Sequence, residues 1–420
     1  MQEYWVRGGT PLNGSLRVQG AKNSVLPLLA ASLLSGENSV VLSDVPELSD
    51  VDVSVELLQS LGCSVCRQKD VLSVDATGAS PVTLDGDLCH KMRSSVLFLG
   101  PMLARFGKAE LSYPGGCVLG ERPIDLHISA LMQMGARFQF GENTLSACCP
   151  EGLQGTAVHL RYPSVGATEN ILMAASLAKG ETLLYNRAVE PEIDDLIELL
   201  VLMGADIQKE TDCVRIVGVP ALHGCSKAVM PDRIAAFTFL AAALATDGKI
   251  TLENCPVGAL GAPFEVVAAA GGAICRKGQS ITVRRAGPFI LPVDQIVSGP
   301  FPAFPTDAGA ITLALLSLAQ GVSTFEETVF SDRFRVVSEL QKMGADIQLQ
   351  GSRATVTGVP SLQGASVCAT DLRAGAALLV AALAAEGESI ISGAEYIQRG
   401  YQSVTDTFGA LGADIAQRSD

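Results

Sequence analysis

The sequence predicts an α+β fold of two domains, each with three repeated βαβαβ-type units around buried parallel helices. Three observations favour this fold. The chain has 420 residues, which is long for a single core. A helix that stops at glycine and leads into a short alternating strand recurs six times. An Ala/Leu-rich helix precedes each of these six segments.

The recurring segment has a period of about 70 residues, which indicates a repeated structural unit. Its copies are "LLQSLGCSV" near 57, "LMQMGARFQ" near 131, "LLVLMGADIQ" near 199, "VVAAAGGAICR" near 266, "ELQKMGADIQ" near 339 and "FGALGADIAQ" near 408. The Ala/Leu-rich helices end at Gly36, Gly107, Gly180, Gly248, Gly321 and Gly387. Helices such as "ILMAASLA" and "FLAAALA" have no polar face, so we expect them to be buried on every side.

The boundary between the two predicted domains falls near residue 230. Residues 22–230 form the first three-unit domain, which includes a loop with a cysteine. Residues 231–420 form the second domain together with residues 1–21, because the N-terminal strand is free to return to it. If the buried helices of each domain run parallel, all six can begin at one interdomain cleft, where we expect the active site.

Composition and charge exclude several classes of function. The net charge of −14 argues against a nucleic-acid-binding surface and against docking on anionic membranes. The longest apolar runs, "VLPLLAASLL" and "AALLVAALAA", are too short to span a bilayer. The N-terminal "MQEYWVRGG" has no apolar signal segment, and the eleven cysteines show no disulfide spacing, so we expect a cytoplasmic protein with reduced thiols.

No metal site is expected. Cys63 and Cys66 would point to opposite faces of a strand, and no second Cys or His pair has suitable spacing. The four histidines, at positions 90, 127, 159 and 223, form no cluster with ligand spacing.

Charged residues lie at the predicted starts of the buried helices. Counting fourteen residues back from each terminal glycine reaches Lys22, Arg93, Gly166, Ile234, Asp307 and Arg373. A helix N-terminus has unsatisfied N–H groups and a partial positive charge, so a cation there costs stability unless an anion offsets it. Lys22, Arg93, Arg233 and Arg373 therefore predict a phosphorylated, carboxylated substrate. For Ser164, Thr168 and Asp307, simple helix capping is the alternative.

The stretch "SYPGGCVLGERPIDLH", residues 112–127, places Cys117 after two glycines and between Pro114 and Pro123. Two glycines and two prolines disfavour a helix or a central strand, so an exposed loop is predicted. Other cysteines, such as Cys255 and Cys275, fall in segments predicted to be buried, where the thiolate is suppressed.

The sixfold unit resembles that of the enolpyruvyl transferases, whose fold is an inside-out α/β barrel in each of two domains. Within that family, one branch uses UDP-N-acetylglucosamine as acceptor. Its motifs are similar to "GAKN" at 20–23, "PGGCVLGERPIDLH" at 114–127, "SVGAT" at 164–168, "EPEI" at 190–193, "FPTD" at 304–307, "DRF" at 332–334, "TDLR" at 370–373 and "RGY" at 399–401. The resemblance covers the whole chain.

This resemblance implies transfer of the enolpyruvyl group of phosphoenolpyruvate to the 3-hydroxyl of UDP-N-acetylglucosamine, with release of phosphate and without a cofactor. That reaction is the first committed step of peptidoglycan synthesis. Two alternatives stay open. One is the relative that uses shikimate 3-phosphate, which lacks the "PGGC" loop, and the other is a catalytically silent paralogue that binds the nucleotide sugar and regulates cell-wall synthesis.

The resemblance also implies roles for individual residues. Cys117 protonates the methylene carbon and attacks as a thiolate, and Asp307 is the base at the sugar hydroxyl. The predicted ligands of the phosphoenolpyruvate phosphate are Lys22, Arg122 and Arg399, and those of its carboxylate are Arg333 and Arg373. The predicted nucleotide-sugar contacts are Asn23, Arg93, Arg122, Pro123, Ile124, Asp125, Leu126, Ser164, Val165, Gly166 and Val329. The supporting residues are Glu190, Asp232, Arg233 and Asp371. Tyr162 stands where some members have a lysine.

Overall fold

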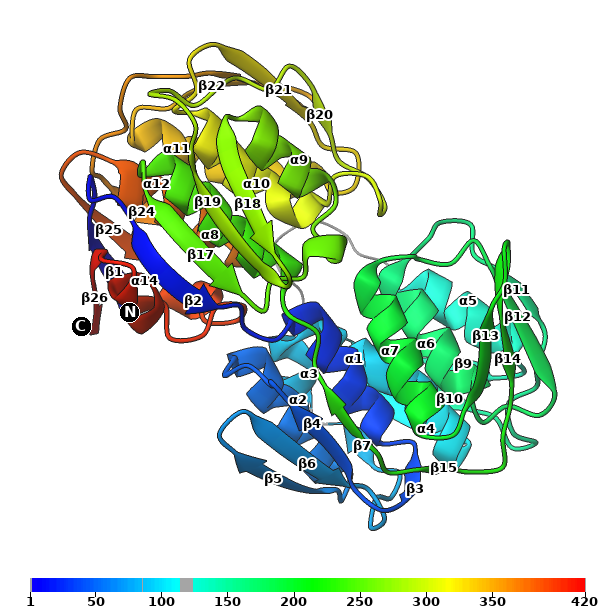
Figure 1. Cartoon of the computed structure of the whole chain (residues 1–420). Coiled ribbons are helices and arrows are strands. Elements are labelled where there is room, and N and C mark those ends of the chain that lie inside the picture. The colour runs from blue at the N-terminus through cyan, green and yellow to red at the C-terminus, as the bar shows by residue number, and fades with distance from the viewer. Residues whose placement is uncertain (1, 85, 114–123, 420) are drawn as a thin grey trace. The chain divides into compact units, whose positions relative to one another are not determined.

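The computed structural model describes residues 2–84, 86–113 and 124–419 (Figure 1). Contacts within the chain divide it into two compact units. The first unit lies between Gly20 and Met230, and the second unit joins the residues up to Gln19 with those from Pro231 onward.

The helices of the first unit are α1 (Lys22–Ser32), α2 (Ser49–Ser60), α3 (Gly86–Lys91), the 3-10 helix η1 (Arg93–Phe98), α4 (Leu99–Phe106), α5 (Asp125–Gln133), α6 (Val165–Ala175) and α7 (Pro191–Leu202). Its strands are β3 (Ser35–Glu37), β4 (Val40–Ser43), β5 (Ser64–Gln68), β6 (Val71–Asp75), β7 (Thr83–Leu84), β8 (Lys108–Ser112), β9 (Arg137–Phe140), β10 (Thr144–Cys148), β11 (Ala157–His159), β12 (Glu181–Tyr185), β13 (Asp206–Lys209), β14 (Cys213–Val217), β15 (Leu222–His223) and β16 (Ser226–Ala228).

The helices of the second unit are α8 (Arg233–Ala245), η2 (Val257–Ala259), α9 (Ala262–Ala269), α10 (Thr306–Leu316), η3 (Ser331–Arg335), α11 (Val336–Lys342), α12 (Leu372–Ala384), α13 (Ala394–Ile397) and α14 (Val404–Ala410). Its strands are β1 (Gln2–Arg7), β2 (Asn13–Arg17), β17 (Lys249–Glu253), β18 (Gly272–Lys277), β19 (Ser280–Arg285), β20 (Ile296–Val297), β21 (Val322–Glu326), β22 (Asp346–Gln350), β23 (Arg353–Thr357), β24 (Ser366–Cys368), β25 (Glu388–Ser392) and β26 (Asp414–Ser419).

One pairing pattern occurs in six four-stranded sheets. In each sheet the first pair of strands is parallel and the next two pairs are antiparallel. The first unit holds β16-β4-β6-β5, β7-β8-β10-β9 and β11-β12-β14-β13, together with the pair β15-β3. The second unit holds β2-β17-β19-β18, β20-β21-β23-β22 and β24-β25-β1-β26. Strands β1 and β2, from the N-terminal segment, therefore pair within the second unit.

The predicted βαβαβ unit lacks one strand that the structure contains. In five of the sheets the second helix is followed by a hairpin of two strands, such as β13 and β14 or β22 and β23. In the sixth sheet β26 pairs with β1 from the other end of the chain. A short polar turn separates the two strands of each hairpin, so the sequence pattern merged them into one strand.

The predicted stops of the recurring helices are confirmed. The glycines at these stops all have positive φ, between 89° and 101°, which is favourable for glycine and rare for other residues. They are Gly62, Gly135, Gly204, Gly271, Gly344 and Gly412.

The predicted starts of the buried helices are also confirmed, with one difference in helix type. Five of them, α1, α6, α8, α10 and α12, begin within one residue of the predicted position. The sixth begins at Arg93 as the 3-10 helix η1 and continues as α4 from Leu99. Pro101, in the first turn of α4, has no N–H for a continuous α-helical ladder, which is consistent with the change of helix type there.

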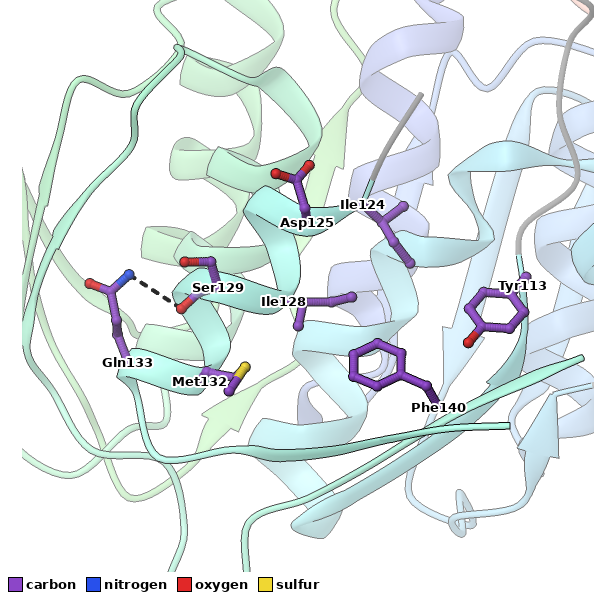
Figure 2. A pocket seen from close by; sticks show the side chains of 8 residues that line it. All are labelled: Tyr113, Ile124, Asp125, Ile128, Ser129, Met132, Gln133 and Phe140. Carbon is purple, nitrogen blue, oxygen red and sulfur yellow. Dashed lines mark hydrogen bonds between the residues drawn. The ribbon is translucent and has the colours of Figure 1, made fainter. Parts of the chain in front are cut away.

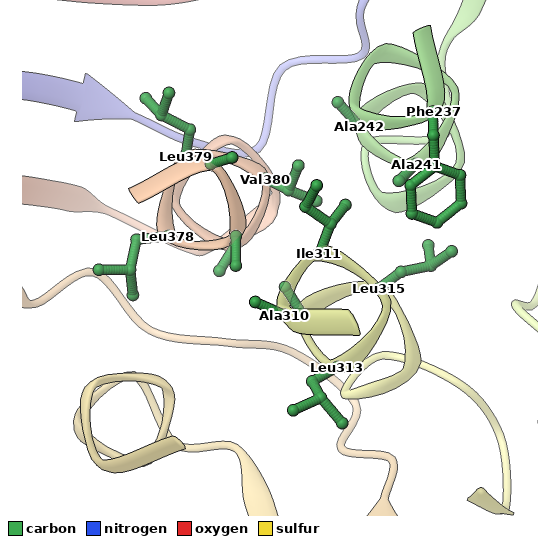
Figure 3. Packing of buried hydrophobic residues seen from close by; sticks show 14 of the residues in the cluster. Phe237, Ala241, Ala242, Ala310, Ile311, Leu313, Leu315, Leu378, Leu379 and Val380 are labelled. Atoms are coloured by element: carbon green, nitrogen blue, oxygen red, sulfur yellow. The ribbon is translucent and has the colours of Figure 1, made fainter. Parts of the chain in front are cut away.

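The Ala/Leu-rich helices of the second unit form its core. Helices α8, α10 and α12 pack against one another, and every residue of α8 from Arg233 to Leu244 is buried. Figure 3 shows Phe237 of α8, Ile311 and Leu315 of α10, and Val380 of α12 in this cluster. Their burial confirms that these helices have no solvent face. No helix in the described ranges is long and apolar enough to cross a membrane.

Candidate active site

Asp307 of the second unit is shared by two buried arginines. It is the second residue of α10, and Oδ2 accepts from Nη2 of Arg373 at 2.6 Å. Its other oxygen, Oδ1, accepts from Nη2 of Arg333, in η3. Nη1 of Arg333 also lies 3.8 Å from Oδ1 of Asp371. The structure thus brings together four predicted site residues from three segments of the chain.

Arg373 is held as a cation despite its burial. Removal from water acts to lower the pKa of its guanidinium, but the charge of Asp307, helped by that of Asp232, outweighs this effect and raises it. Tyr401 is buried, which raises its pKa to about 12, and its hydroxyl lies 2.7 Å from that of Thr238. The start of α12 is therefore an electrostatically coupled cluster.

Two aspartates of this region serve as helix caps. Asp232 accepts from the N–H groups of Ile234 and Ala235 at the start of α8, at 2.8 and 2.9 Å. Asp371 does the same for Arg373 and Ala374 at the start of α12, at 2.8 and 3.1 Å. Each cap satisfies N–H groups that have no partner inside the helix.

Lys22 has a carboxylate partner in the first unit. It is the first residue of α1, and its Nζ lies 2.8 Å from Oδ2 of Asp50, in α2. Both side chains are almost completely buried. The sequence predicts that a substrate offsets the cations at the helix starts, but for Lys22 and Arg373 a carboxylate of the chain already does so. Asp50 was not predicted, because it lies in α2, outside the motif "GAKN" that contains Lys22.

Arg93 lies close to a buried histidine that the sequence analysis considered only as a metal ligand. Asn170 Oδ1 accepts from the N–H of Gly100 at 2.7 Å, so its amide nitrogen donates to His127 Nδ1 at 2.8 Å. His127 is therefore neutral, with its proton on Nε2. Burial, helped by the charge of Arg93, lowers its pKa to about 4. A methyl group on Gly166 would lie 3.0 Å from His127 Cε1, so a larger residue here would crowd the imidazole ring.

The predicted nucleotide-sugar turn forms the start of α6. Ser164 is the N-cap residue, and its hydroxyl accepts from the N–H of Ala167 at 3.4 Å. Ser164, Val165 and Gly166 are all half-buried. Asp125, the first residue of α5, forms an ion pair with the exposed Arg161, and the neighbouring Tyr162 is exposed as well. A basic residue thus lies next to the position where some family members have lysine.

Glu190 lies in a group of acidic residues at the start of α7. It is the N-cap residue, and Glu192 is in the first turn. Glu169, in α6, is buried, and burial together with Glu192 and Glu190 raises its pKa to about 8. Glu169 is thus held in the protonated form at neutral pH.

The other predicted residues are placed as follows. Asn23 is in α1, and Ile124 and Leu126 lie at the start of α5. Arg233 is the first residue of α8, and its guanidinium lies 5.8 Å from the centre of the Phe301 ring. Val329 precedes η3, and Arg399 follows α13. Cys117, Arg122 and Pro123 lie outside the described residues.

The predicted burial of the other cysteines is only partly right. Cys255 is buried, and burial raises its pKa to about 12. Cys275 is exposed, because β18 is the edge strand of its sheet. The exposed cysteines of the described ranges are Cys66, Cys148, Cys275 and Cys368. Within the same ranges no three His, Cys, Asp or Glu side chains are arranged to hold a metal ion.

A pocket of about 670 Å³ lies beside α5 (Figure 2). Its lining is Tyr113, Ile124, Asp125, Ile128, Ser129, Met132, Gln133 and Phe140. It includes two predicted contact residues, Ile124 and Asp125, but it has a largely apolar wall and no cation. This pocket therefore offers no cation to an anionic ligand.

Comparison with known proteins places these observations in a family. The sequence model of EPSP synthase (3-phosphoshikimate 1-carboxyvinyltransferase) matches residues 6–408. The chain is 42% identical over 430 residues to the UDP-N-acetylglucosamine 1-carboxyvinyltransferase of Lawsonia intracellularis, covering 100% of both chains. It is 45% identical over 416 residues to the protein of the same name from Oleidesulfovibrio alaskensis, covering 99% of each.

Two solved structures share the fold. The enolpyruvyl transferase NikO from Streptomyces tendae superposes with a TM-score of 0.91 at 23% identity, over 100% of this chain and 99% of that chain. EPSP synthase from Acinetobacter baumannii gives a TM-score of 0.77 at 19% identity, over 100% of both. The chain therefore belongs to the EPSP synthase family of enolpyruvyl transferases and, within it, to the UDP-N-acetylglucosamine 1-carboxyvinyltransferases.

Proposed function

We propose that the chain transfers the enolpyruvyl group of phosphoenolpyruvate to the 3-hydroxyl of UDP-N-acetylglucosamine, in the cytoplasm, as the first committed step of peptidoglycan synthesis. Identities of 42% and 45% over the full length to relatives of that name support it. The structural observation that carries the proposal is the sharing of Asp307 between Arg333 and Arg373, both buried. That cluster offers two cations to an acidic substrate and a carboxylate to its acceptor.

The reaction balances without a cofactor. In the first half, the sugar oxygen bonds to C2 of phosphoenolpyruvate, its proton leaves to a base, and C3 gains a proton from an acid. In the second half, C3 loses a proton and C2 loses phosphate, which restores the double bond as an enol ether. Each half needs one group that gives a proton and one that takes it.

Asp307 is proposed as the base, and its ion pairs suggest how it is activated. Two guanidinium groups donate to its oxygens. A substrate carboxylate bound by Arg333 and Arg373 would replace Asp307 as their partner, since guanidinium binds carboxylates through paired N–H groups. Asp307 would then be left to accept the proton of the sugar hydroxyl. Arrival of one substrate would thus switch on the base for the other.

The acid and the phosphate ligands are proposed from the sequence. Cys117 supplies the proton to C3, and its thiolate can then bond to C2 as a thioether and leaves again when the sugar oxygen bonds to C2. Arg122 lowers the pKa of the thiol. The phosphate binds to Lys22, Arg122 and Arg399. To bind it, Lys22 would give up its ion pair with Asp50.

We also propose that the six sheets and their buried helices are six copies of one repeated unit, arranged as an inside-out barrel in each of two domains. The assigned residues come from both units, so neither unit alone should be active.

The acceptor is the sharpest test of this proposal. The purified chain is incubated with phosphoenolpyruvate and either UDP-N-acetylglucosamine or shikimate 3-phosphate, and the products are identified by mass spectrometry. The proposal predicts a carboxyvinyl ether of the nucleotide sugar alone. A carboxyvinyl ether of shikimate 3-phosphate would assign the chain to the other activity of the family.

A further inference from the structure

We propose that Glu327 and Thr306 hold Arg333 by its Nε edge and thereby set the affinity for phosphoenolpyruvate. Glu327 is a positioning residue in this account, because it acts on the substrate through Arg333. The inference rests on the proposed function, in which Arg333 binds the substrate carboxylate. Glu327 lies in no motif of the sequence, and Thr306 entered the Sequence analysis only as a member of "FPTD" at 304–307.

Glu327 is a buried carboxylate that accepts four hydrogen bonds. Oε1 accepts from the hydroxyl of Ser298 at 2.8 Å and from the N–H groups of Val329 and Phe330 at 2.8 and 3.1 Å. Oε2 accepts from the hydroxyl of Thr306 at 2.7 Å. A buried carboxylate is costly unless it is satisfied in this way, so its retention at this place requires an explanation.

The direction of each hydrogen bond through Thr306 is fixed by chemistry. A carboxylate has no proton to give, so the Thr306 hydroxyl donates its single hydrogen to Glu327. The hydroxyl oxygen is then left to accept, and Nε of Arg333 donates to it at 3.2 Å. Guanidinium, hydroxyl and carboxylate therefore form a directed chain that ends on a buried negative charge.

This chain of hydrogen bonds determines where the other two guanidinium nitrogens of Arg333 lie. With Nε held by Thr306, Nη2 reaches Asp307 and Nη1 faces Asp371 at 3.8 Å. The guanidinium also lies 5.5 Å from the centre of the Phe330 ring, whose N–H is itself bound to Glu327. Glu327 thus fixes the guanidinium through both Thr306 and the backbone at Phe330. A fixed plane favours two-point binding of a carboxylate, because less rotamer freedom is lost on binding.

The alternative is that Glu327 only anchors the segment between β21 and η3. Glu327→Gln separates the two readings. The N–H groups of Val329 and Phe330 need an oxygen opposite them, so the amide nitrogen must face Thr306. The Thr306 oxygen would then receive two donors, and its own proton would lose its acceptor. The segment stays anchored, while the Thr306 oxygen is shared between two donors and the hydrogen bonds from Arg333 no longer lead to a negative charge.

The experiment compares four variants in steady-state assays. Glu327→Gln and Thr306→Val should each raise the KM for phosphoenolpyruvate about tenfold, the value expected for one charge-assisted hydrogen bond. Thr306→Ser keeps the hydroxyl and should restore the wild-type KM. The Kd for UDP-N-acetylglucosamine, measured by calorimetry without phosphoenolpyruvate, should stay within about twofold in all of them. Glu326→Gln is the control, since its carboxylate makes no hydrogen bond or ion pair within the described ranges.

A double variant tests whether Glu327 and Thr306 act on Arg333 through the same chain of hydrogen bonds. Glu327→Gln with Thr306→Val should raise the KM no further than Thr306→Val alone, because both remove the same interaction. The inference is overturned if active variants keep the wild-type KM for phosphoenolpyruvate, or if the KM and the nucleotide-sugar Kd rise together. Failure of the proposed function would be seen separately, as a wild-type chain without carboxyvinyl transfer.

Discussion

Arg373 and Asp307 each lie in the first turn of a buried helix, α12 and α10, and Nη2 of the arginine lies 2.6 Å from Oδ2 of the aspartate. The positive end of a helix dipole favours Asp307 and disfavours Arg373. Placing the two starts together lets the aspartate offset the cation. The ion pair therefore keeps the guanidinium of Arg373 charged at the start of a buried helix.

The first prediction concerns the base. Asp307→Asn should lower kcat about 100- to 10,000-fold, the range for loss of general acid–base catalysis. It also removes the shared charge from Arg333 and Arg373, so a lower melting temperature is expected. Phosphate release and thermal unfolding measure the two effects, with Asp346→Asn, an exposed aspartate, as the control. Wild-type kcat in a folded Asp307→Asn chain would exclude Asp307 as the base.

A second prediction concerns the guanidinium of Arg373. Lysine keeps the charge but has no planar fork, so Arg373→Lys should raise the KM for phosphoenolpyruvate about tenfold or more. The Kd for UDP-N-acetylglucosamine should change much less. Steady-state kinetics and calorimetry distinguish the two. A loss of nucleotide-sugar affinity with an unchanged KM for phosphoenolpyruvate would move Arg373 to the other substrate.

The helix starts were predictable because their spacing from the terminal glycine is set by the length of a buried helix. The residues that contact the site residues could not be predicted from the sequence. Asp50, Glu327 and Asn170 belong to segments distant in sequence from the residues they contact. No local pattern shows such a contact, since it depends on how separate helices and strands pack together within each unit.

Burial of single side chains was also only partly predictable. Cys255 and Cys275 were both expected to be buried, but only Cys255 is, and Cys275 is exposed on β18, at one edge of its sheet. An alternating pattern shows that a strand has two faces without showing whether it lies at the edge of a sheet. In this sheet β18 lies at one edge and β2, from the far N-terminal segment, lies at the other.

The third prediction concerns pH and stability. Glu169 has its pKa raised to about 8 from an ordinary value of 4.5, so the native chain keeps its proton where the unfolded chain loses it. This contribution to stability is complete below pH 4.5 and is lost as pH rises through 8, at up to about 1.4 kcal/mol per pH unit. Glu169→Gln should remove this loss, so it should be more stable than the wild type at pH 8 and similar at pH 4.5. Denaturant unfolding followed by circular dichroism checks it, with exposed Glu395→Gln as control. Parallel pH profiles for Glu169→Gln and the wild type would contradict the shift.

A fourth prediction concerns the eleven thiols. Fosfomycin, an epoxide phosphonate that resembles phosphoenolpyruvate, should alkylate Cys117 alone, and faster when UDP-N-acetylglucosamine is present. Iodoacetamide should also label the exposed Cys66, Cys148, Cys275 and Cys368. Peptide mass spectrometry separates the adducts. Cys117→Ser should abolish the fosfomycin adduct and Cys66→Ser should keep it; fosfomycin adducts at the four exposed thiols would show simple accessibility instead.

Release of phosphate tests the central claim most directly. The purified chain is assayed in the presence of a chelator with phosphoenolpyruvate alone, UDP-N-acetylglucosamine alone, and both together. We expect phosphate only with both substrates, with one phosphate released for each carboxyvinyl ether formed. Phosphate release that does not need the nucleotide sugar, or no release from the folded wild-type chain with both substrates, would contradict the proposed transfer.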